Sequence, residues 1–445
     1  MDYKQAEEWI LEIPKFTKKN GFSVSCDFYE YLGRPGEKSR IVHVAGTNGK
    51  GSTCAYLESF LLNAGHSVGL FTSPHLITMR ERMRVDREDV SEEEFLSDFN
   101  LLSEFVNKYR EDVLSDYYPT FFEWLFFQAM LYFDRHAPEY IILETGLGGA
   151  LDTTNVVEQK ELTLITGIAY DHMEYLGNTL PEIAGQKAGI LRKNVPLIYW
   201  SEVPEVDEVI ENTAKKVGCY AIPISDEYLR SQSLCEKHID FSVSFSYPNR
   251  YDCRVMLPVR AAYQIQNLMM ALEGYEILAG HWPSQEDIDR VVEETHWPCR
   301  MEEILPGVWA DGAHNPDGIR AFVESVAPVE NGRKDKSILL FAVVKDKDYE
   351  EMLSELLGGM DFEAVVLTTV GGYRAADLAG IGKIAGRYFR GDIRMIPDVT
   401  EAFLTALSLR GPEGSSRSLY VVGSLYLVGE VRRIVHSRAM DWKKE

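Results

Sequence analysis

The chain has 445 residues and a formal net charge of -23. This length exceeds the size at which one hydrophobic core usually divides, so we expect two domains. The negative charge disfavours broad binding to nucleic acid or anionic lipid, and no apolar run approaches the roughly 18 residues that span a bilayer. The six scattered cysteines include no C-x-x-C pair of the kind found in zinc or redox motifs, and the N-terminus lacks a signal peptide, which favours a cytoplasmic location.

The first part of the chain alternates short runs rich in β-branched residues with longer amphipathic segments, the pattern of a mostly parallel sheet. Helices in this part have readable start signals, because Ser91 with Glu94 and Thr120 with Glu123 form capping boxes. The helix after Thr120 is apolar nearly all round and should be buried. We predict strands at 41–45, 68–71, 140–143 and 162–168.

A second alternating series follows the segment 296–299, which has the character of a linker. It predicts strands at 308–310, 338–344, 364–369, 393–396 and 419–422. The expected fold is therefore α/β, with a P-loop-containing, mostly parallel sheet domain over residues 1–297 and a smaller Rossmann-like domain over residues 298–445. The less regular stretch 201–255 is expected to add an antiparallel edge to the first domain.

The strongest chemical signal is a glycine-rich loop between the strand at 41–45 and an amphipathic helix that ends near residue 65. Glycines let backbone N–H groups approach phosphate oxygens, the helix N-terminus favours anions, and a lysine adds a point charge. The spacing is shorter than the common G-x-x-x-x-G-K-[ST]. The alternative is a glycine-rich turn with an exposed lysine. The loop residues are Gly46, Thr47, Asn48, Gly49, Lys50, Gly51 and Ser52.

Three polar side chains follow predicted strands, where ligand sites of open α/β sheets collect. Glu144 closes the strand at 140–143, and an acid at that position suits Mg²⁺. Ser73 follows the strand at 68–71, and His172 follows the strand at 162–168. Histidine is a soft ligand for magnesium, so His172 considered alone is better interpreted as structural or hydrogen-bonding.

The loop sequence G-T-N-G-K-G-S resembles that of the Mur ligase superfamily, specifically its folylpolyglutamate synthase and dihydrofolate synthase branch. The resemblance extends over almost the whole chain, and the joint occurrence of its motifs in one order is highly specific. The further similar segments are 72–76 (TSPHL), 119–123 (PTFFE), 144–149 (ETGLGG), 152–155 (DTTN), 171–172 (DH), 187–190 (KAGI), 311–316 (DGAHNP), 345–348 (KDKD) and 423–426 (GSLY).

The resemblance implies ATP as the nucleotide, with two magnesium ions held by Ser73, Glu144 and His172. It also implies that Lys187, which alone would be interpreted as a salt-bridging lysine, is carbamylated and supports the second metal, which requires burial and nearby cations to lower its pKa. Lys50, Lys187 and His172 are then the catalytic residues. Further ATP contacts are implied for Asn267, Arg300, Asp311 and His314.

The resulting hypothesis is an ATP-dependent ligase that adds L-glutamate to a folate through an acyl-phosphate, and the sequence leaves open whether dihydropteroate is also an acceptor. One alternative is a P-loop kinase or NTPase acting on another carboxylate-bearing small molecule, and another is a non-catalytic nucleotide-binding module. We expect a monomer with small-molecule partners and no nucleic-acid or membrane partner. Four departures from the family pattern leave the substrate range open: Ala150, Gln186, Tyr263 and Cys299.

The segment 79–87 concentrates arginines in this acidic chain. It is either a solvated loop with local Arg–Glu pairs or a site where guanidinium groups meet folate or glutamate carboxylates.

Overall fold

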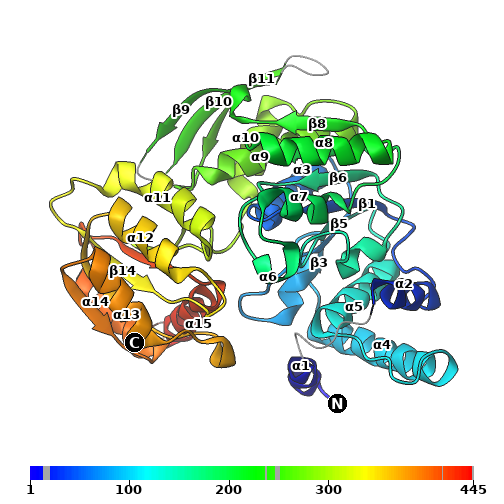
Figure 1. Ribbon diagram of the computed structural model, residues 1–445, viewed down its shortest axis with the longest axis horizontal. Coiled ribbons are helices and arrows are strands. Elements are labelled where there is room, and N and C mark those ends of the chain that lie inside the picture. Colours follow the sequence, from blue (N-terminus) through cyan, green and yellow to red (C-terminus); the bar gives the residue numbers. More distant parts are fainter. Residues whose placement is uncertain (14–20, 236–237, 246–250, 413, 443–445) are drawn as a thin grey trace. The chain divides into compact units, whose positions relative to one another are not determined.

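The computed structural model describes residues 1–13, 21–235, 238–245, 251–412 and 414–442. Its contacts group the chain into two compact units, the first comprising Met1–Glu227 and Gln266–Thr295 and the second Tyr228–Ile265 and His296–Glu445. Both units are α/β structures with parallel-rich sheets (Figure 1), which confirms the predicted fold class. The domain boundary between residues 297 and 298 stays a prediction. The division by contacts follows a different line, because it assigns residues 228–265 to the second unit.

The first unit is built on an eight-stranded sheet in the order β4-β3-β2-β5-β1-β6-β7-β8. Six neighbouring strands, from β2 to β8, run parallel, and β3 with β4 adds a short antiparallel edge. The strand that precedes the glycine-rich loop, β1, is therefore central. The bounds are β1 Arg40–Ala45, β2 Val68–Phe71, β3 Met83–Val85, β4 Glu88–Asp89, β5 Tyr140–Glu144, β6 Leu162–Ile165, β7 Leu197–Trp200 and β8 Ala221–Ile224.

Helices cover both faces of this sheet, because its central strands are apolar on both sides. Ile141 and Leu143 of β5 pack into an aromatic core with α5, whereas α3 contacts β1, β2 and β5. The capping boxes predicted at Ser91 and Thr120 are present at the starts of α4 and α5. The helices are α1 Tyr3–Glu12, α2 Phe22–Tyr31, α3 Lys50–Asn63, α4 Glu92–Asp112, α5 Phe121–His136, α6 Met173–Leu176, α7 Leu180–Ala188, α8 Pro204–Val217 and α10 Gln285–Glu294, with 3-10 turns η1 Met79–Arg82 and η2 Thr153–Val156.

Helix α9 (Tyr263–Ala279) carries two buried carboxyl groups, Glu273 and Glu276. Neither carboxylate oxygen of Glu273 has a hydrogen-bond partner among the described residues. Burial, together with the charge of Glu276, raises the pKa of Glu273 to about 8. Glu273 is therefore mostly protonated at neutral pH, since a charged carboxylate without partners is costly to bury.

The second unit contains a six-stranded sheet in the order β12-β13-β17-β14-β15-β16, parallel except for β12. All five strands predicted after residue 300 are found, with ends shifted by at most three residues. They are β13 Val308–Ala310, β14 Ser337–Phe341, β15 Phe362–Leu367, β16 Asp392–Met395 and β17 Leu419–Val422, with β12 Glu302–Leu305 at the edge and helices α11 Pro316–Glu330, α12 Tyr349–Gly359, α13 Leu378–Tyr388, α14 Val399–Arg410 and α15 Leu425–Trp442, and a 3-10 turn η4 Gly372–Arg374.

The stretch 201–255 does not add an antiparallel edge to the first sheet, contrary to the expectation from its sequence. Instead β8 continues that sheet in parallel, and β9 (Leu229–Leu234), β10 (Ile239–Phe245) and β11 (Tyr251–Leu257) form a separate antiparallel sheet, preceded by the 3-10 turn η3 Asp226–Tyr228. The alternating burial along β11 reflects a sheet with one apolar and one solvent face. Among the described residues, no helix is long and apolar enough to cross a membrane.

Candidate active site

The glycine-rich loop connects the end of β1 to the start of α3, and two of its glycines adopt left-handed backbone conformations. The φ angle is 147° at Gly46 and 89° at Gly49. A Cβ on Gly46 would lie 1.8 Å from the hydroxyl of Thr166, and a Cβ on Gly49 would lie 2.2 Å from Oδ1 of Asn267. Glycine is therefore required at both positions for conformation and for space.

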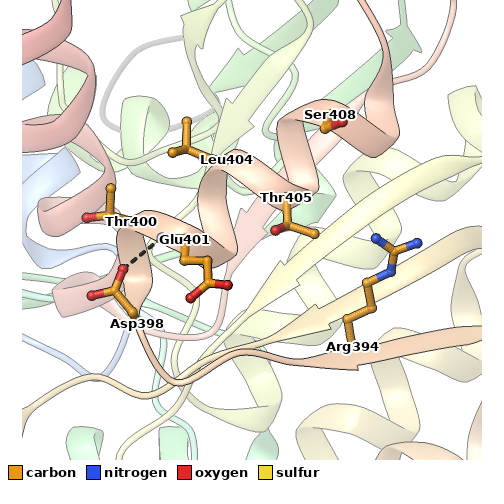
Figure 2. Close-up of a pocket in the computed structure, with 7 residues that line it drawn as sticks. All are labelled: Arg394, Asp398, Thr400, Glu401, Leu404, Thr405 and Ser408. Atoms are coloured by element: carbon orange, nitrogen blue, oxygen red, sulfur yellow. Dashed lines mark hydrogen bonds between the residues drawn. The ribbon is translucent and has the colours of Figure 1, made fainter.

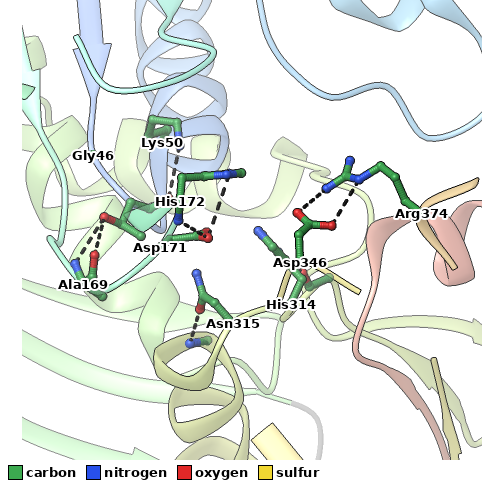
Figure 3. A network of polar contacts seen from close by, with 12 residues as sticks. Gly46, Lys50, Ala169, Asp171, His172, His314, Asn315, Asp346 and Arg374 are labelled. Carbon is green, nitrogen blue, oxygen red and sulfur yellow. Dashed lines mark hydrogen bonds and ion pairs between the residues drawn. The ribbon is translucent and has the colours of Figure 1, made fainter. Parts of the chain in front are cut away.

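Side-chain hydrogen bonds hold this loop in place. The hydroxyl of Thr47 accepts from the backbone N–H of Ala169 at 3.1 Å, and the hydroxyl of Thr166 donates to the carbonyl of Asn48 at 2.7 Å. Figure 3 shows the loop residue Gly46 and Ala169 within this part of the first unit. The loop backbone is thus fixed where the N-terminus of α3 already favours an anion.

Lys50 and Glu144 come together in the first unit, as the phosphate-loop interpretation requires. Nζ of Lys50 lies 3.9 Å from Oε1 of Glu144 and donates to the carbonyl of Thr47 at 3.1 Å. The backbone N–H of Ser73 donates to Oε2 of the same carboxylate at 3.0 Å. Because Glu144 ends β5 and Ser73 follows β2, two adjacent parallel strands deliver both residues to one edge of the sheet.

Lys187 lies in the last turn of α7, and its side chain is buried against the glycine-rich loop. Its Nζ donates to the carbonyl of Gly46 at 2.6 Å. Burial and the nearby charge of Lys50 lower the pKa of Lys187 to about 7, against the opposing influence of Asp171 and Asp152. At neutral pH a substantial fraction of this amine is neutral and nucleophilic, whereas an ordinary lysine is almost wholly charged.

His172 is the N-cap residue just before the short helix α6 and has a left-handed backbone, with φ 50°. Its backbone N–H donates to Oδ1 of Asp171 at 2.8 Å, and its Nε2 lies 3.9 Å from the same oxygen, as Figure 3 shows. Asp171 also acts on the pKa of Lys187, so the His172 segment faces the same region as the buried lysine. The sequence pattern assigned no separate role to Asp171, although it lies in a motif shared with the resembling family.

The loop after β5 packs directly against the backbone at the end of α7. Asp152 holds the loop by accepting from the backbone N–H of Leu147 at 2.8 Å. The N–H of Ala150 donates to the carbonyl of Gln186 at 2.7 Å, and a Cβ on Gly149 would lie 2.7 Å from the carbonyl of Lys187. This close packing couples the segment that follows Glu144 to the helix that carries Lys187.

Two further features suit a phosphate and metal site. The hydroxyl of Ser52 is buried and has no hydrogen-bond partner among the described residues. At the first turn of α3 this hydroxyl could bind a cation through its oxygen or donate a hydrogen bond to a phosphate. The buried carboxylate of Glu144 is the hard oxygen ligand that magnesium prefers. Oδ1 of Asn267 lies within reach of the hydroxyl of Thr53, at 3.5 Å, and so borders the same turn.

In the second unit, Asp311 follows β13 and is buried. Its carboxylate accepts from the backbone N–H groups of Met301 and Ala313, at 3.0 and 2.8 Å, and from the hydroxyl of Tyr263. Burial raises the pKa of Asp311, while the charge of Arg300 and these hydrogen bonds oppose the rise. The tyrosine that departs from the family pattern at position 263 thus binds a predicted site residue.

Arg300 and His314 both approach Gly312 in the same unit. Nη1 of Arg300 donates to the carbonyl of Cys299 at 2.9 Å, and a Cβ on Gly312 would lie 2.3 Å from that nitrogen. Nδ1 of His314 donates to the carbonyl of Gly312 at 2.8 Å. Asn315 then caps α11 by accepting from the N–H of Gly318.

Most of the arginine-rich segment 79–87 is not a solvated loop, because it forms η1 and β3, whereas Asp86 and Arg87 at its end are exposed. Arg82 is buried, and its Nε donates to Nδ1 of His75 at 2.8 Å. Arg84 pairs with the buried carboxylate of Glu58 on α3, with Nε donating at 3.0 Å. These two arginines are bound within the protein; a substrate-binding role for the segment stays untested.

A surface pocket lies on the second unit, away in sequence from every motif described above (Figure 2). Asp398 caps α14 at its rim by accepting from the backbone N–H of Glu401 at 2.8 Å. The lining combines three hydroxyl side chains with two carboxyl groups, one arginine and one leucine, and none of the residues predicted for the site takes part. Its lining residues are Arg394, Asp398, Thr400, Glu401, Leu404, Thr405 and Ser408.

Comparison with known proteins agrees with this geometry. Residues 44–273 match the Mur ligase middle domain, and residues 300–424 match the Mur ligase glutamate ligase domain. The chain is thus an ATP-dependent ligase of the Mur type. It is 32% identical to the dihydrofolate synthase/folylpolyglutamate synthase of Bacillus subtilis, with 97% of this chain and 98% of the relative covered, and 27% identical to the folylpolyglutamate synthase of Lacticaseibacillus casei over the same shares.

Solved structures show the same fold over nearly the full length. A folylpolyglutamate synthase from Thermotoga maritima has a TM-score of 0.80 at 29% identity, covering 98% of this chain and 96% of that chain. The Mycobacterium tuberculosis folylpolyglutamate synthase complexed with ADP has a TM-score of 0.88 at 24% identity, covering 97% and 98%. The chain belongs to the folylpolyglutamate synthase/dihydrofolate synthase family.

Proposed function

We propose that this chain uses ATP to join L-glutamate to the γ-carboxylate of a folate, to the carboxylate of dihydropteroate, or to both. The observation that carries the proposal is the placement of Lys50 beside Glu144, next to a rigid glycine-rich loop, in a chain that matches both Mur ligase domains. That arrangement supplies what phosphoryl transfer needs, which is positioned donors and a cation beside an acid that suits a metal.

The reaction has two steps. An oxygen of the substrate carboxylate attacks the γ-phosphorus of ATP, ADP leaves, and an acyl-phosphate forms. The α-amine of glutamate then attacks the acyl carbon, loses a proton and expels inorganic phosphate, leaving an amide. In the first step the loop N–H groups and the ammonium of Lys50 stabilise charge on the phosphoryl oxygens. We place the β- and γ-phosphates of ATP along residues 46–52.

Magnesium fits the residues of the first unit, since the Glu144 carboxylate and the Ser52 hydroxyl are buried oxygen donors. On this proposal Ser73, Glu144 and His172 hold two magnesium ions. The ions would neutralise phosphate charge when bound. The chain's own contribution is to fix the carboxylate of Glu144 through the N–H of Ser73 and to keep Lys50 within 3.9 Å of it.

Lys187 is proposed to be carbamylated. Its neutral amine attacks the carbon of CO₂ and releases a proton, which leaves a negatively charged carbamate. The side chain of Lys187 would then be an anion, whereas a protonated lysine is a cation. The burial of Nζ and its lowered pKa support this chemistry, because only the neutral amine reacts. The carbamate would stand beside the glycine-rich loop and add negative charge that supports the second metal ion.

Asn267, Arg300, Asp311 and His314 are proposed as further contacts of ATP. Asn267 borders the first turn of α3, and Arg300 lies against Gly312. The remaining parts of the proposal are a monomeric state, a cytoplasmic location and no nucleic-acid or membrane partner. Size-exclusion chromatography with light scattering measures the oligomeric state.

A coupled ADP-release assay tests the function. With tetrahydrofolate or dihydropteroate as acceptor, ADP release should require L-glutamate, and mass spectrometry should find a product heavier by one glutamyl residue. A kinase or simple NTPase would release ADP without glutamate and form no amide. Glutamate-independent turnover at the full rate would therefore overturn the proposal, and comparison of the two acceptors decides which of the two activities the chain has.

A further inference from the structure

A second cluster of metal-binding side chains lies outside the active site, on the sheet formed by β9, β10 and β11. Among the described residues, one group of at least three His, Cys, Asp or Glu side chains has all its donor atoms within 4.8 Å of one another, and its members are Cys235, His238 and Asp240. We propose that this cluster binds a divalent transition-metal ion of the zinc type.

The hairpin geometry explains why the three side chains converge. Cys235 and His238 lie opposite each other where β9 turns into β10, because the N–H of Cys235 donates to the carbonyl of His238 at 2.9 Å. Asp240 follows His238 by two residues and so projects from the same face of the strand. Its partner on β9 is Ser233. The pairing of the two strands thus brings together a thiol, an imidazole and a carboxylate, which are three different kinds of metal ligand.

This face of the sheet is turned to solvent, so a metal ion can reach it. Side chains at the odd-numbered positions of β10, such as Phe241 and Val243, are buried on the opposite face. On the solvent face the hydroxyl of Ser231 lies 2.7 Å from that of Ser242, which confirms that β9 and β10 share this side. The cluster side chains are only partly buried.

The distances suit tetrahedral zinc. Nitrogen and oxygen ligands of such a site lie about 3.4 Å apart when the metal bonds are about 2.1 Å long. Nε2 of His238 lies 3.4 Å from Oδ2 of Asp240. The three residues each place one ligand atom, the sulfur of Cys235 among them, within 4.8 Å of the others, so the sulfur needs a shift of at most about 1.3 Å to complete three ligands at the usual Zn–S bond length. Water would supply the fourth ligand.

The ligand set selects the class of metal. A thiolate with an imidazole favours zinc, cobalt or copper over magnesium and calcium, whose ligands are mainly oxygens. Coordination by Cys235 displaces the thiol proton, so binding should release protons and weaken at low pH. The net charge of -23 attracts cations to this surface in general. The spacing C-x-x-H differs from the paired C-x-x-C of common zinc motifs.

Cobalt is a spectroscopic probe for this site, because a thiolate ligand gives Co²⁺ an intense near-ultraviolet charge-transfer band. The magnesium-free protein, reduced and freed of metal, is titrated with Co²⁺ alone and then with Zn²⁺. We expect one band-forming Co²⁺ per chain, displaced by stoichiometric Zn²⁺. Cys235→Ser should abolish the band, and Asp240→Asn should weaken Co²⁺ binding by at least about tenfold.

Cys219→Ser is the matched control, since Cys219 is also half-buried and belongs to no such group among the described residues. This variant should keep the band, and Cys235→Ser should keep glutamate ligation, which distinguishes failure of this proposal from failure of the proposed function. Absence of a thiolate band in the wild-type protein would show a His238–Asp240 ion pair only and overturn the proposal. A band that persists in Cys235→Ser would assign the metal to another thiol and overturn it equally.

Discussion

Replacing Lys50 with methionine tests the phosphate-loop assignment most directly, because the substitution keeps the aliphatic stem and removes the charge. Nζ lies 3.9 Å from Oε1 of Glu144, a separation at which the gross attraction is roughly 4 kcal/mol at an effective dielectric constant of about 20. Desolvation offsets much of this attraction. In the unmodified chain, burial and the charge of Lys50 both lower the pKa of Lys187, so loss of Lys50 also removes its repulsion with the Lys187 ammonium.

These opposing effects predict a small change in stability and a large change in activity. We expect Lys50→Met to lower the free energy of unfolding by about 1 to 2 kcal/mol, out of the 5 to 15 kcal/mol typical of a domain. The loss of a charge directed at phosphoryl oxygens should lower kcat by about 100-fold to 1,000-fold, equivalent to about 2.7 to 4 kcal/mol. The protein should remain folded while it loses catalysis.

The assay combines glutamate-dependent ADP release with thermal denaturation of the same samples. Lys215→Met on α8 is the control, because it removes the same charge from an exposed side chain whose partner is Glu211 at 3.6 Å. That variant should match the wild type in both measurements. A folded Lys50→Met protein with wild-type turnover would refute the reasoning and leave the glycine-rich loop as a structural turn.

The other predictions concern four buried or constrained positions. Glu144→Gln should shift the magnesium titration of activity to higher concentrations, and an unchanged titration would make this residue structural. Lys187→Ala should lose activity that acetate restores in part; rescue by an alkylamine instead would contradict the carbamate. Gly49→Ala should weaken nucleotide binding and lower the melting temperature, since φ is 89° there and the Cβ lacks space; unchanged binding by calorimetry would show that the loop adapts. The raised pKa of Glu273, about 8 against about 4.3 when unfolded, means that the folded state binds more protons between these values, so stability is lost as pH rises through this window. Glu273→Gln should remove that loss and be more stable than wild type at pH 8 in urea denaturation, and equal pH dependence of the two proteins would count against a neutral buried carboxyl.

The sequence patterns succeed where structure depends on local periodicity. Short apolar runs locate the strands at 68–71, 308–310 and 419–422 with the observed ends. The glycine spacing likewise locates the loop before α3, and the position of Glu144 at a strand end follows from the end of an apolar run. Such features are set by neighbouring residues, so a single sequence contains them.

Contacts between segments that are far apart in sequence cannot be predicted in the same way. Nothing local to Lys187 indicates that its Nζ lies 2.6 Å from the carbonyl of Gly46, because α7 and the loop are far apart in sequence. The placement of β9, β10 and β11 in a separate sheet is equally non-local, since β-propensity does not say which strands pair. The partner of Arg84 on α3 could not be named from the segment 79–87 alone.

The backbone packing between the loop after β5 and the end of α7 has a consequence for how substitutions change this enzyme. The separation of these segments at Gly149, Ala150 and Gly189 is set by main-chain atoms, with a Cβ on Gly189 only 2.3 Å from that of Ala150. A side chain added at Gly149 or Gly189 would push α7 outward and carry Lys187 away from Gly46. Natural or laboratory variants at these two glycines should therefore alter the chemistry of a lysine that they do not replace, and an engineer who seeks new acceptor specificity should leave them unchanged.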